Sequence, residues 1–219
     1  MVTVMPRRPE HFFNQAGRIE VTAGPMFAGK SSYIISWAER WQRAGASVYV
    51  VKHPLDVRYE GVGKISSHDG RSVDCEALAD PMEIYERVQE KDPLIVIIDE
   101  TQFFRDKQEI LVEVVRQLAE EGRIVMLAGL NMDFKGEPFG PMAVLMAIAD
   151  QVVNLYAICS ECGADASFTQ RLIDGQPAPY DSEVVVVGAA EQYTARCREH
   201  HLVPGKKNLA DLFRQKKSE

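Results

Sequence analysis

Residues 24–32 read GPMFAGKSS, and this short run constrains the fold more than any other feature of the chain. It matches the phosphate-loop pattern G-x-x-x-x-G-K-[ST] at Gly24, Gly29, Lys30 and Ser31. A strand-like run, Ile19–Ala23, precedes it and a helical pattern follows it. In such a strand–loop–helix unit the loop N–H groups and the helix N-terminus face the phosphates of a nucleotide. The run therefore predicts a nucleotide-binding α/β protein.

The rest of the chain repeats this alternation of strands and helices. Further strand-like runs are Ser47–Lys52, Leu94–Asp99, Arg123–Gly129 and Gln151–Ala157. Helical patterns begin near Pro81 and cover residues 106–121 and 141–149. Alternation of this kind predicts an α/β fold with a P-loop (RecA-like), mainly parallel sheet that carries helices on both faces.

The sequence changes character after Ala157, where a Gly/Pro-rich stretch with two short strand candidates begins. These candidates are SFTQRL (Ser167–Leu172) and EVVVVG (Glu183–Gly188), and residues 174–182 between them suit a mobile lid. We expect four parts in all. They are a flexible N-terminal arm (1–17), the P-loop domain (18–157), a small second lobe (158–205) and a basic C-terminal tail (206–219).

A small lobe of this size needs an internal staple, and four side chains have the right spacing to supply one. Cys159-x-x-Cys162 and Cys197-x-x-His200 form two half-sites, and three thiolates with one imidazole complete a closed, structural zinc tetrahedron. A redox C-x-x-C motif is the alternative reading, and His201 is the alternative fourth ligand. Cys75 is interpreted as an ordinary cysteine.

Two acidic residues end the apolar run LIVIID, at the edge where open α/β sheets bind ligands. We expect Asp99, together with the Ser31 hydroxyl, to hold Mg²⁺, and Lys30 to neutralise the β/γ-phosphates. Glu100 can accept a proton from a hydroxyl or from water. The alternative is that these acids only cap the next helix. The pair alone does not decide between hydrolysis and transfer to an alcohol.

These three signals together resemble the type II thymidine kinase family. The likeness continues through KHPLDVRY (52–59), SSHDG (66–70), GLNMDFKGEPFGPM (129–142), SFTQRL (167–172) and EQYTARCREHH (191–201), so it covers roughly residues 17 to 205. It departs from many members at Asn131, where they have Asp, and from some at His200, where they have Cys.

The resemblance implies an acceptor that the pattern alone does not give: the γ-phosphoryl of ATP would move to the 5′-hydroxyl of thymidine, or of deoxyuridine. It implies that Glu100 is the general base. The implied ATP-binding residues are Gly24, Pro25, Met26, Phe27, Ala28, Gly29, Lys30, Ser31, Asp56, Val57, Arg58, Asp99, Glu100, Thr101 and Gln102. The implied nucleoside-binding residues are Met26, Leu130, Phe134, Thr169, Val184, Val185, Val186, Val187, Gly188 and Tyr193.

The expected cofactors are structural zinc and Mg²⁺ with ATP, and the family likeness implies a homotetramer. A net charge of −7 argues against a nucleic-acid partner, and no run reaches the length of a membrane span. We expect a cytoplasmic enzyme. Alternative functions are a P-loop ATPase or GTPase, a kinase for another small molecule, or a nucleic-acid-binding module on the zinc lobe.

Overall fold

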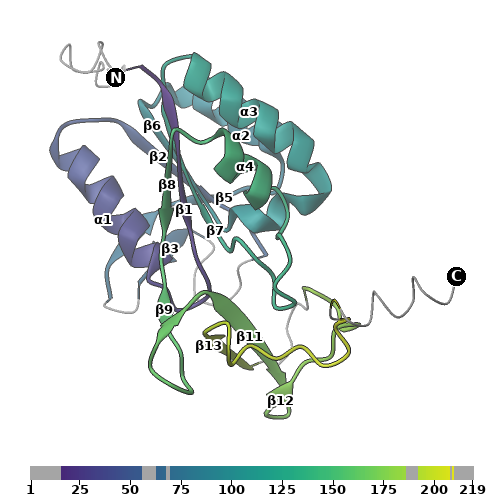
Figure 1. The fold of residues 1–219 in the computed structure, drawn as a ribbon. Coiled ribbons are helices and arrows are strands. Elements are labelled where there is room, and N and C mark those ends of the chain that lie inside the picture. The colour runs from purple at the N-terminus through teal and green to yellow at the C-terminus, as the bar shows by residue number, and fades with distance from the viewer. Residues whose placement is uncertain (1–15, 56–62, 68–69, 186–191, 208, 210–219) are drawn as a thin grey trace, which may run out of the picture.

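The computed structural model describes residues 16–55, 63–67, 70–185, 192–207 and 209. Its centre is a six-stranded sheet in the order β5-β2-β6-β7-β1-β8, and every neighbouring pair is parallel (Figure 1). The strands are β1 (Arg18–Ala23), β2 (Val48–Lys52), β5 (Glu76–Ala77), β6 (Ile95–Asp99), β7 (Ile124–Gly129) and β8 (Gln151–Asn154). The prediction of a mainly parallel α/β sheet is confirmed.

Helices cover both faces of this sheet, as Figure 1 shows. They are α1 (Lys30–Arg43), α2 (Pro81–Lys91), the 3-10 helix η2 (Thr101–Lys107), α3 (Gln108–Glu120) and α4 (Met142–Ile148). Alternate residues of β6 serve different faces: Ile95 and Ile97 pack with α1, whereas Val96 and Ile98 pack with α2, α3 and α4. This period of two explains why the strand is apolar throughout.

A small antiparallel hairpin, β3 (Lys64–Ser66) with β4 (Ser72–Asp74), lies beside α1. The Arg71 guanidinium, in the connection between the two strands, donates to the Ser36 hydroxyl of α1 at 2.8 Å. No sequence pattern predicted this hairpin. It matters because its first strand forms one wall of the site described below.

The segment after β8 forms a second group of strands, in which every pairing is antiparallel. The strands are β9 (Ala157–Ile158), β10 (Asp165–Ala166), β11 (Phe168–Ile173), β12 (Gln176–Pro177) and β13 (Gln192–Arg196). β9 pairs with β10, and β11 lies between β12 and β13. The strand predicted over Ser167–Leu172 is confirmed as β11.

The second strand candidate, EVVVVG, is wrong over Glu183–Val185, which lie outside any strand. Its other residues, 186–188, lie outside the described residues. A run of β-branched side chains favours a strand, but here the Glu183 carbonyl accepts a hydrogen bond from the Arg171 guanidinium instead of a strand partner. The actual neighbour of β11 is β13. Among the described residues, no helix combines the length and the apolar character needed to cross a bilayer.

Candidate functional site

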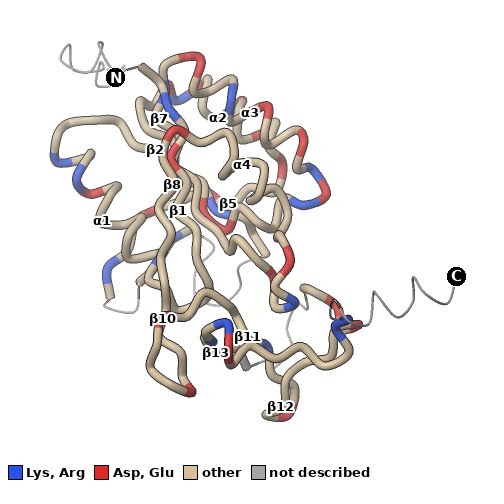
Figure 2. The backbone as a smooth tube through the Cα atoms, in the orientation of Figure 1, with Lys and Arg blue, Asp and Glu red and all other residues tan. Residues whose placement is uncertain are grey.

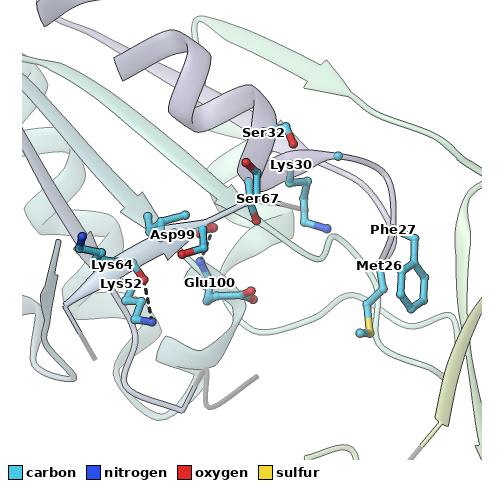
Figure 3. A pocket seen from close by; sticks show the side chains of 13 residues that line it. Met26, Phe27, Lys30, Ser32, Lys52, Lys64, Ser67, Asp99 and Glu100 are labelled. Carbon is cyan, nitrogen blue, oxygen red and sulfur yellow. Dashed lines mark hydrogen bonds between the residues drawn. The ribbon is translucent and has the colours of Figure 1, made fainter. Parts of the chain in front are cut away.

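The phosphate loop lies at the carboxyl end of β1 and leads into α1 (Figure 3). Gly29 caps α1 with a left-handed φ of 81°, and a Cβ on Gly24 would lie 2.4 Å from the Leu155 carbonyl oxygen. Both positions therefore require glycine. The Lys30 ammonium donates to the carbonyl oxygens of Pro25 at 2.7 Å and Gly24 at 3.2 Å. The Lys30 side chain thus folds back onto the backbone of the phosphate loop.

The loop opens onto a hollow of about 170 Å³ that is shared with the ends of neighbouring strands (Figure 3). Its described lining consists of Met26, Phe27, Gly29, Lys30, Ser31, Ser32, Lys52, Lys64, Ile65, Ser66, Ser67, Asp99 and Glu100. Three ammonium groups, two carboxylates and several hydroxyls therefore face one small volume. Such a set suits a highly charged anion accompanied by a cation.

The two acidic residues stand at the end of β6, and both are almost fully buried, with 4% of Asp99 and 7% of Glu100 exposed. Asp99 Oδ1 accepts a hydrogen bond from the Glu100 N–H at 2.9 Å. Glu100 has a left-handed φ of 53° and precedes η2, yet its side chain makes no capping bond to that helix. The carboxylate instead accepts from Gln102 Nε2 at 2.5 Å. Capping is therefore not what this side chain does.

Other predicted phosphate-site residues have mixed placements. Asp99, Glu100 and Ser31 line one hollow, as expected for a metal-assisted site, whereas Thr101 and Gln102 are buried behind it. Phe27 is 56% exposed and has a positive φ of 67°. Ala28 packs against the small core of the second lobe. Asp56, Val57 and Arg58 lie outside the described residues.

Of the predicted nucleoside residues, Met26 lines the hollow, whereas Thr169, Phe134 and Tyr193 lie on β11 or beside it. The Thr169 hydroxyl accepts from the Met26 N–H at 3.0 Å, so the phosphate loop touches the second lobe directly. The Arg171 guanidinium lies 5.3 Å from the centre of the Phe134 ring, and Tyr193 is the register partner of Arg171 in β13. β11 therefore gathers these side chains from three separate segments.

The remaining nucleoside predictions fall on two further segments. The Leu130 N–H donates to Gln102 Oε1 at 3.0 Å, which places Leu130 one side chain away from Glu100. Val184 and Val185 follow Glu183, whose carbonyl Arg171 holds. Val186, Val187 and Gly188 lie outside the described residues.

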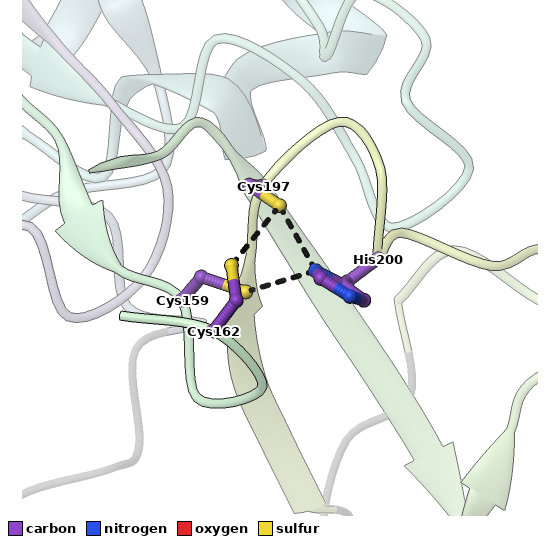
Figure 4. A group of neighbouring side chains, drawn as sticks. All are labelled: Cys159, Cys162, Cys197 and His200. Atoms are coloured by element: carbon purple, nitrogen blue, oxygen red, sulfur yellow. Dashed lines mark hydrogen bonds between the residues drawn. The ribbon is translucent and has the colours of Figure 1, made fainter. Parts of the chain in front are cut away.

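Cys159, Cys162, Cys197 and His200 come together in the second lobe (Figure 4). Their ligand atoms all lie within 4.8 Å of one another. Cys162 Sγ lies 3.8 Å from Cys197 Sγ, close to the edge of about 3.8 Å that zinc–sulfur bonds of about 2.3 Å would give a tetrahedron. Burial raises the pKa of the Cys159 thiol, but N–H groups of Cys197, Glu161 and Cys162 outweigh it and lower that pKa to about 6. These four side chains could together hold a metal ion.

His201, the alternative ligand, turns away from this cluster. Its ring stacks on Phe168 at 4.6 Å between centroids with 14° between the planes, and its Nε2 lies 2.8 Å from the Phe134 carbonyl oxygen. Because that oxygen can only accept, Nε2 carries the proton. Burial lowers the pKa of His201, which favours the neutral ring. Cys75 is remote from the cluster and packs beside the α1 core.

Several lining residues were missed by the sequence reasoning. Lys52 ends β2 and donates from Nζ to the Lys64 carbonyl oxygen at 3.1 Å, which ties the hairpin to the sheet. Ser66 and Ser67 complete that wall. The only signal for Lys52, Ser66 and Ser67 was their place in the runs KHPLDVRY and SSHDG, where the family likeness gave a role to residues 56–58 but none to these three.

Lys and Arg residues are interspersed with Asp and Glu residues along the described backbone, as Figure 2 shows.

The sequence profile described as thymidine kinase matches residues 17–201. A thymidine kinase of Mycoplasmoides gallisepticum (strain R(low / passage 15 / clone 2)) is 45% identical over 190 residues, which cover 87% of this chain and 83% of that protein. The profile match includes the phosphate loop, the acidic pair and the Cys/His cluster. The chain belongs to the thymidine kinase family.

Proposed function

We propose that this chain transfers the γ-phosphoryl of ATP to the 5′-hydroxyl of thymidine, and that it also accepts deoxyuridine. The product, dTMP, would enter deoxynucleotide salvage. One observation carries the proposal: a phosphate loop and a buried carboxylate, Glu100, face the same hollow, and a single glutamine links that carboxylate to Leu130. Donor and acceptor ends of a transfer reaction are thereby close together.

The loop Gly24–Ser31 would hold the phosphates through its N–H groups and the N-terminus of α1. For Lys30 to reach them, its ammonium must exchange the Pro25 and Gly24 carbonyls for phosphate oxygens. Asp56 to Arg58 and Asp99 to Gln102 would lie near the same phosphates. Ser31 and Asp99 offer the hydroxyl and carboxylate oxygens that Mg²⁺ prefers, and this ion would neutralise developing charge.

Glu100 would take the proton of the 5′-hydroxyl as the oxygen–phosphorus bond forms, and ADP would leave. The Glu100 carboxylate reaches the hollow from the end of β6, where it can accept this proton. Water would have to be excluded from the closed site, since it competes with the alcohol.

Met26, Leu130, Phe134, Thr169 and Tyr193 would surround the thymidine, with the backbone of residues 184–188 reading the base edge. The contacts of Thr169 with Met26 and of Arg171 with Phe134 support this, because they bring the second lobe against the phosphate loop. An apolar and aromatic surround with a few polar groups suits a methylated pyrimidine.

The metal of the Cys/His cluster would be zinc in a structural role. Three sulfurs and one imidazole nitrogen are the donor set that Zn²⁺ prefers, and the set leaves no open position for chemistry. The family likeness supports a cytoplasmic homotetramer. In each chain, the boundary between the P-loop domain and the zinc-binding lobe would lie between residues 157 and 158. Light scattering on the purified protein tests the assembly.

The test of the reaction is ADP release in the presence of Mg-ATP and a panel of nucleosides. We expect release to depend on thymidine, less strongly on deoxyuridine, and not on purine nucleosides. Glu100→Gln should lower kcat by at least about 10²-fold with ATP affinity little changed, since general-base assistance contributes about 10²–10⁴-fold. Asp99→Asn is the matched variant and should in addition raise the Mg²⁺ concentration needed.

ADP release without any nucleoside would contradict transfer and favour an ATPase. ADP release that depends on a different nucleoside would identify that nucleoside as the acceptor in place of thymidine. If Glu100→Gln keeps most of its kcat for thymidine, the base is another residue.

A further inference from the structure

Gln102, a glutamine with no exposed surface, forms hydrogen bonds to the proposed base, Glu100, and to the backbone N–H of Leu130, a proposed nucleoside-binding residue. We propose that Gln102 is a positioning residue for phosphoryl transfer: it holds the Glu100 carboxylate aimed into the hollow. This inference rests on the proposed function and adds a residue that acts through the base.

The orientation of the Gln102 amide follows from its two partners. The Leu130 N–H can only donate, so the atom that meets it at 3.0 Å must be the carbonyl oxygen, Oε1. The NH₂ group then faces Glu100 Oε2 at 2.5 Å and must donate. A donor that is itself fixed by a backbone group holds one oxygen of the Glu100 carboxylate in a set direction. The amide therefore orients the Glu100 carboxylate.

The slot that holds this amide has no spare room. A Cβ on Gly129 would lie 2.5 Å from Gln102 Oε1 and 2.9 Å from Met142 Sδ, and a Cβ on Gly140 would lie 2.3 Å from the Gln102 carbonyl oxygen. Two absent side chains therefore make the space in which the glutamine lies. Close packing near Gly129 and Met142 therefore restricts the movement of the amide.

The backbone around Glu100 fixes the other end of the arrangement. Glu100 has a positive φ of 53°, which a non-glycine residue adopts only when its surroundings hold it there. The Thr101 hydroxyl donates to the Ile98 carbonyl oxygen at 3.0 Å, and the Phe103 N–H donates to the Glu100 carbonyl oxygen at 3.0 Å. With the backbone held and one carboxylate oxygen engaged, the direction of the second oxygen is set as well.

This arrangement has a use in the reaction. Leu130 is a proposed wall of the thymine pocket, and its N–H shares one amide with the proton acceptor. A shift of the pocket wall therefore moves the base by the same rigid connection. The position of the nucleoside and the orientation of the Glu100 carboxylate are therefore coupled. Precise relative orientation of the reacting groups is what gives a large rate effect.

The experiment compares two variants at this position. Gln102→Met keeps the length of the side chain but has neither donor nor acceptor. Gln102→Glu keeps an acceptor for the Leu130 N–H but puts a second carboxyl group against Glu100. We expect Gln102→Met to lower kcat about 10- to 100-fold, within the range that the base itself contributes, with KM for thymidine and ATP changed less than about threefold.

Gln102→Glu should lose more kcat at pH 8 and recover part of it near pH 6. Two adjacent carboxyl groups share one proton there, so the new carboxylic acid can donate to Glu100 as the amide did. Asp99, Lys30, Lys52 and Lys64 also line the hollow, but they are unchanged in every variant, so their titration is common to all profiles.

A double-mutant cycle shows whether Gln102 acts through Glu100. If it does, Gln102→Met costs less than about twofold in kcat once Glu100→Gln is present. Gln170→Met is the matched control, because Gln170 is also buried and its amide bridges to the Leu202 N–H and carbonyl, both at 2.9 Å. The control should be destabilised yet keep most of its kcat and the wild-type pH profile.

The inference is overturned if Gln102→Met keeps its kcat, if the two substitutions add fully, or if Gln170→Met loses as much. Different results would contradict this inference and the proposed function. An absence of thymidine-dependent ADP release in the wild-type chain defeats the function, whereas an impaired Glu100→Gln beside a normal Gln102→Met defeats only this inference.

Discussion

Individual side chains at this site make contacts within the protein, and some of these contacts must be exchanged for contacts with substrate. Lys30 is the clearest case, because its ammonium binds two carbonyl oxygens of its own loop. Carbonyl oxygens are neutral, so a phosphate oxygen is the stronger partner for the ammonium. The loop geometry is thus maintained without nucleotide by a contact that nucleotide can replace.

We expect Lys30→Ala to lower kcat by about 10²–10³-fold or more, because Lys30 stabilises charge on the transferring group. The loop should lose its internal tie as well, so the affinity for ATP should fall. Rates from coupled ADP release and a thermal melt are the measurements. Near-normal turnover in a folded variant would remove the phosphate-loop assignment, and Lys91→Ala on the outer face of the molecule serves as the charge-matched control.

At the scale of elements, the loop between β7 and α4 is held from the second lobe. His201 connects the two, since its ring stacks on Phe168 and its Nε2–H donates to the Phe134 carbonyl oxygen at 2.8 Å. Tyr180 adds a hydrogen bond from its hydroxyl to Glu137 Oε1 at 2.8 Å. The loop that carries Leu130 and Phe134 is therefore placed by residues far along the chain.

His201→Phe keeps the stacked ring but removes the hydrogen bond to Phe134. A hydrogen bond of this kind contributes about 0.5–1.5 kcal/mol, so we expect KM for thymidine to rise about 2- to 10-fold while kcat and KM for ATP change little. Steady-state kinetics with each substrate varied measures this. An equal rise in both KM values would mean that the loop does not serve the nucleoside in particular.

Prediction from sequence succeeded where the signal was local. The phosphate loop, the strand that ends in Asp99 and the pairs of cysteines are each contiguous or closely spaced, so their chemistry can be read directly. The strand β13 and the hairpin β3–β4 were missed because such short strands are defined by their partners rather than by their own pattern.

Contacts across long sequence separations could not be predicted at all. Met26 and Thr169 are 143 residues apart, and His201 lies 67 residues from Phe134. Nothing in either segment marks the other, so the sequence offered His201 only as an alternative metal ligand and did not predict its contact with Phe134. The glutamine that bridges Glu100 and Leu130 was equally unpredictable, because one of its partners lies 28 residues later.

At the scale of the whole molecule, the two parts differ in how they are stabilised. The sheet has a large apolar core on each face, whereas the apolar cluster in the described part of the second lobe consists of Ala157, Cys159, Ala166 and Ala195, with Phe168 and Ala178 buried outside it. The small side chains of that cluster supply little hydrophobic free energy. A metal ion held by the adjacent Cys/His cluster would therefore add to the stability of the lobe.

Removal of the metal by a strong chelator, or Cys162→Ser, should loosen residues 158–205 while the sheet stays folded. Thymidine affinity should then weaken more than ATP affinity, because Thr169 and Tyr193 belong to the lobe whereas the phosphate loop belongs to the sheet. Hydrogen exchange by mass spectrometry and elemental analysis are the measurements. Carefully purified protein with well under one zinc ion per chain, or with unchanged exchange after chelation, would contradict this account. Cys75→Ser is the control.

The position of β1 in the sheet has a consequence for synthesis of the chain. β1 is made first, yet it lies between β7 and β8, whose residues 124–129 and 151–154 are made last in the sheet. At the usual 5–20 residues per second, the nascent phosphate loop waits on the order of 10 s for its neighbours. Its tie to Thr169 comes later still. A partly translated chain therefore exposes an apolar strand before it has a nucleotide site, and chaperone protection matters most in that interval.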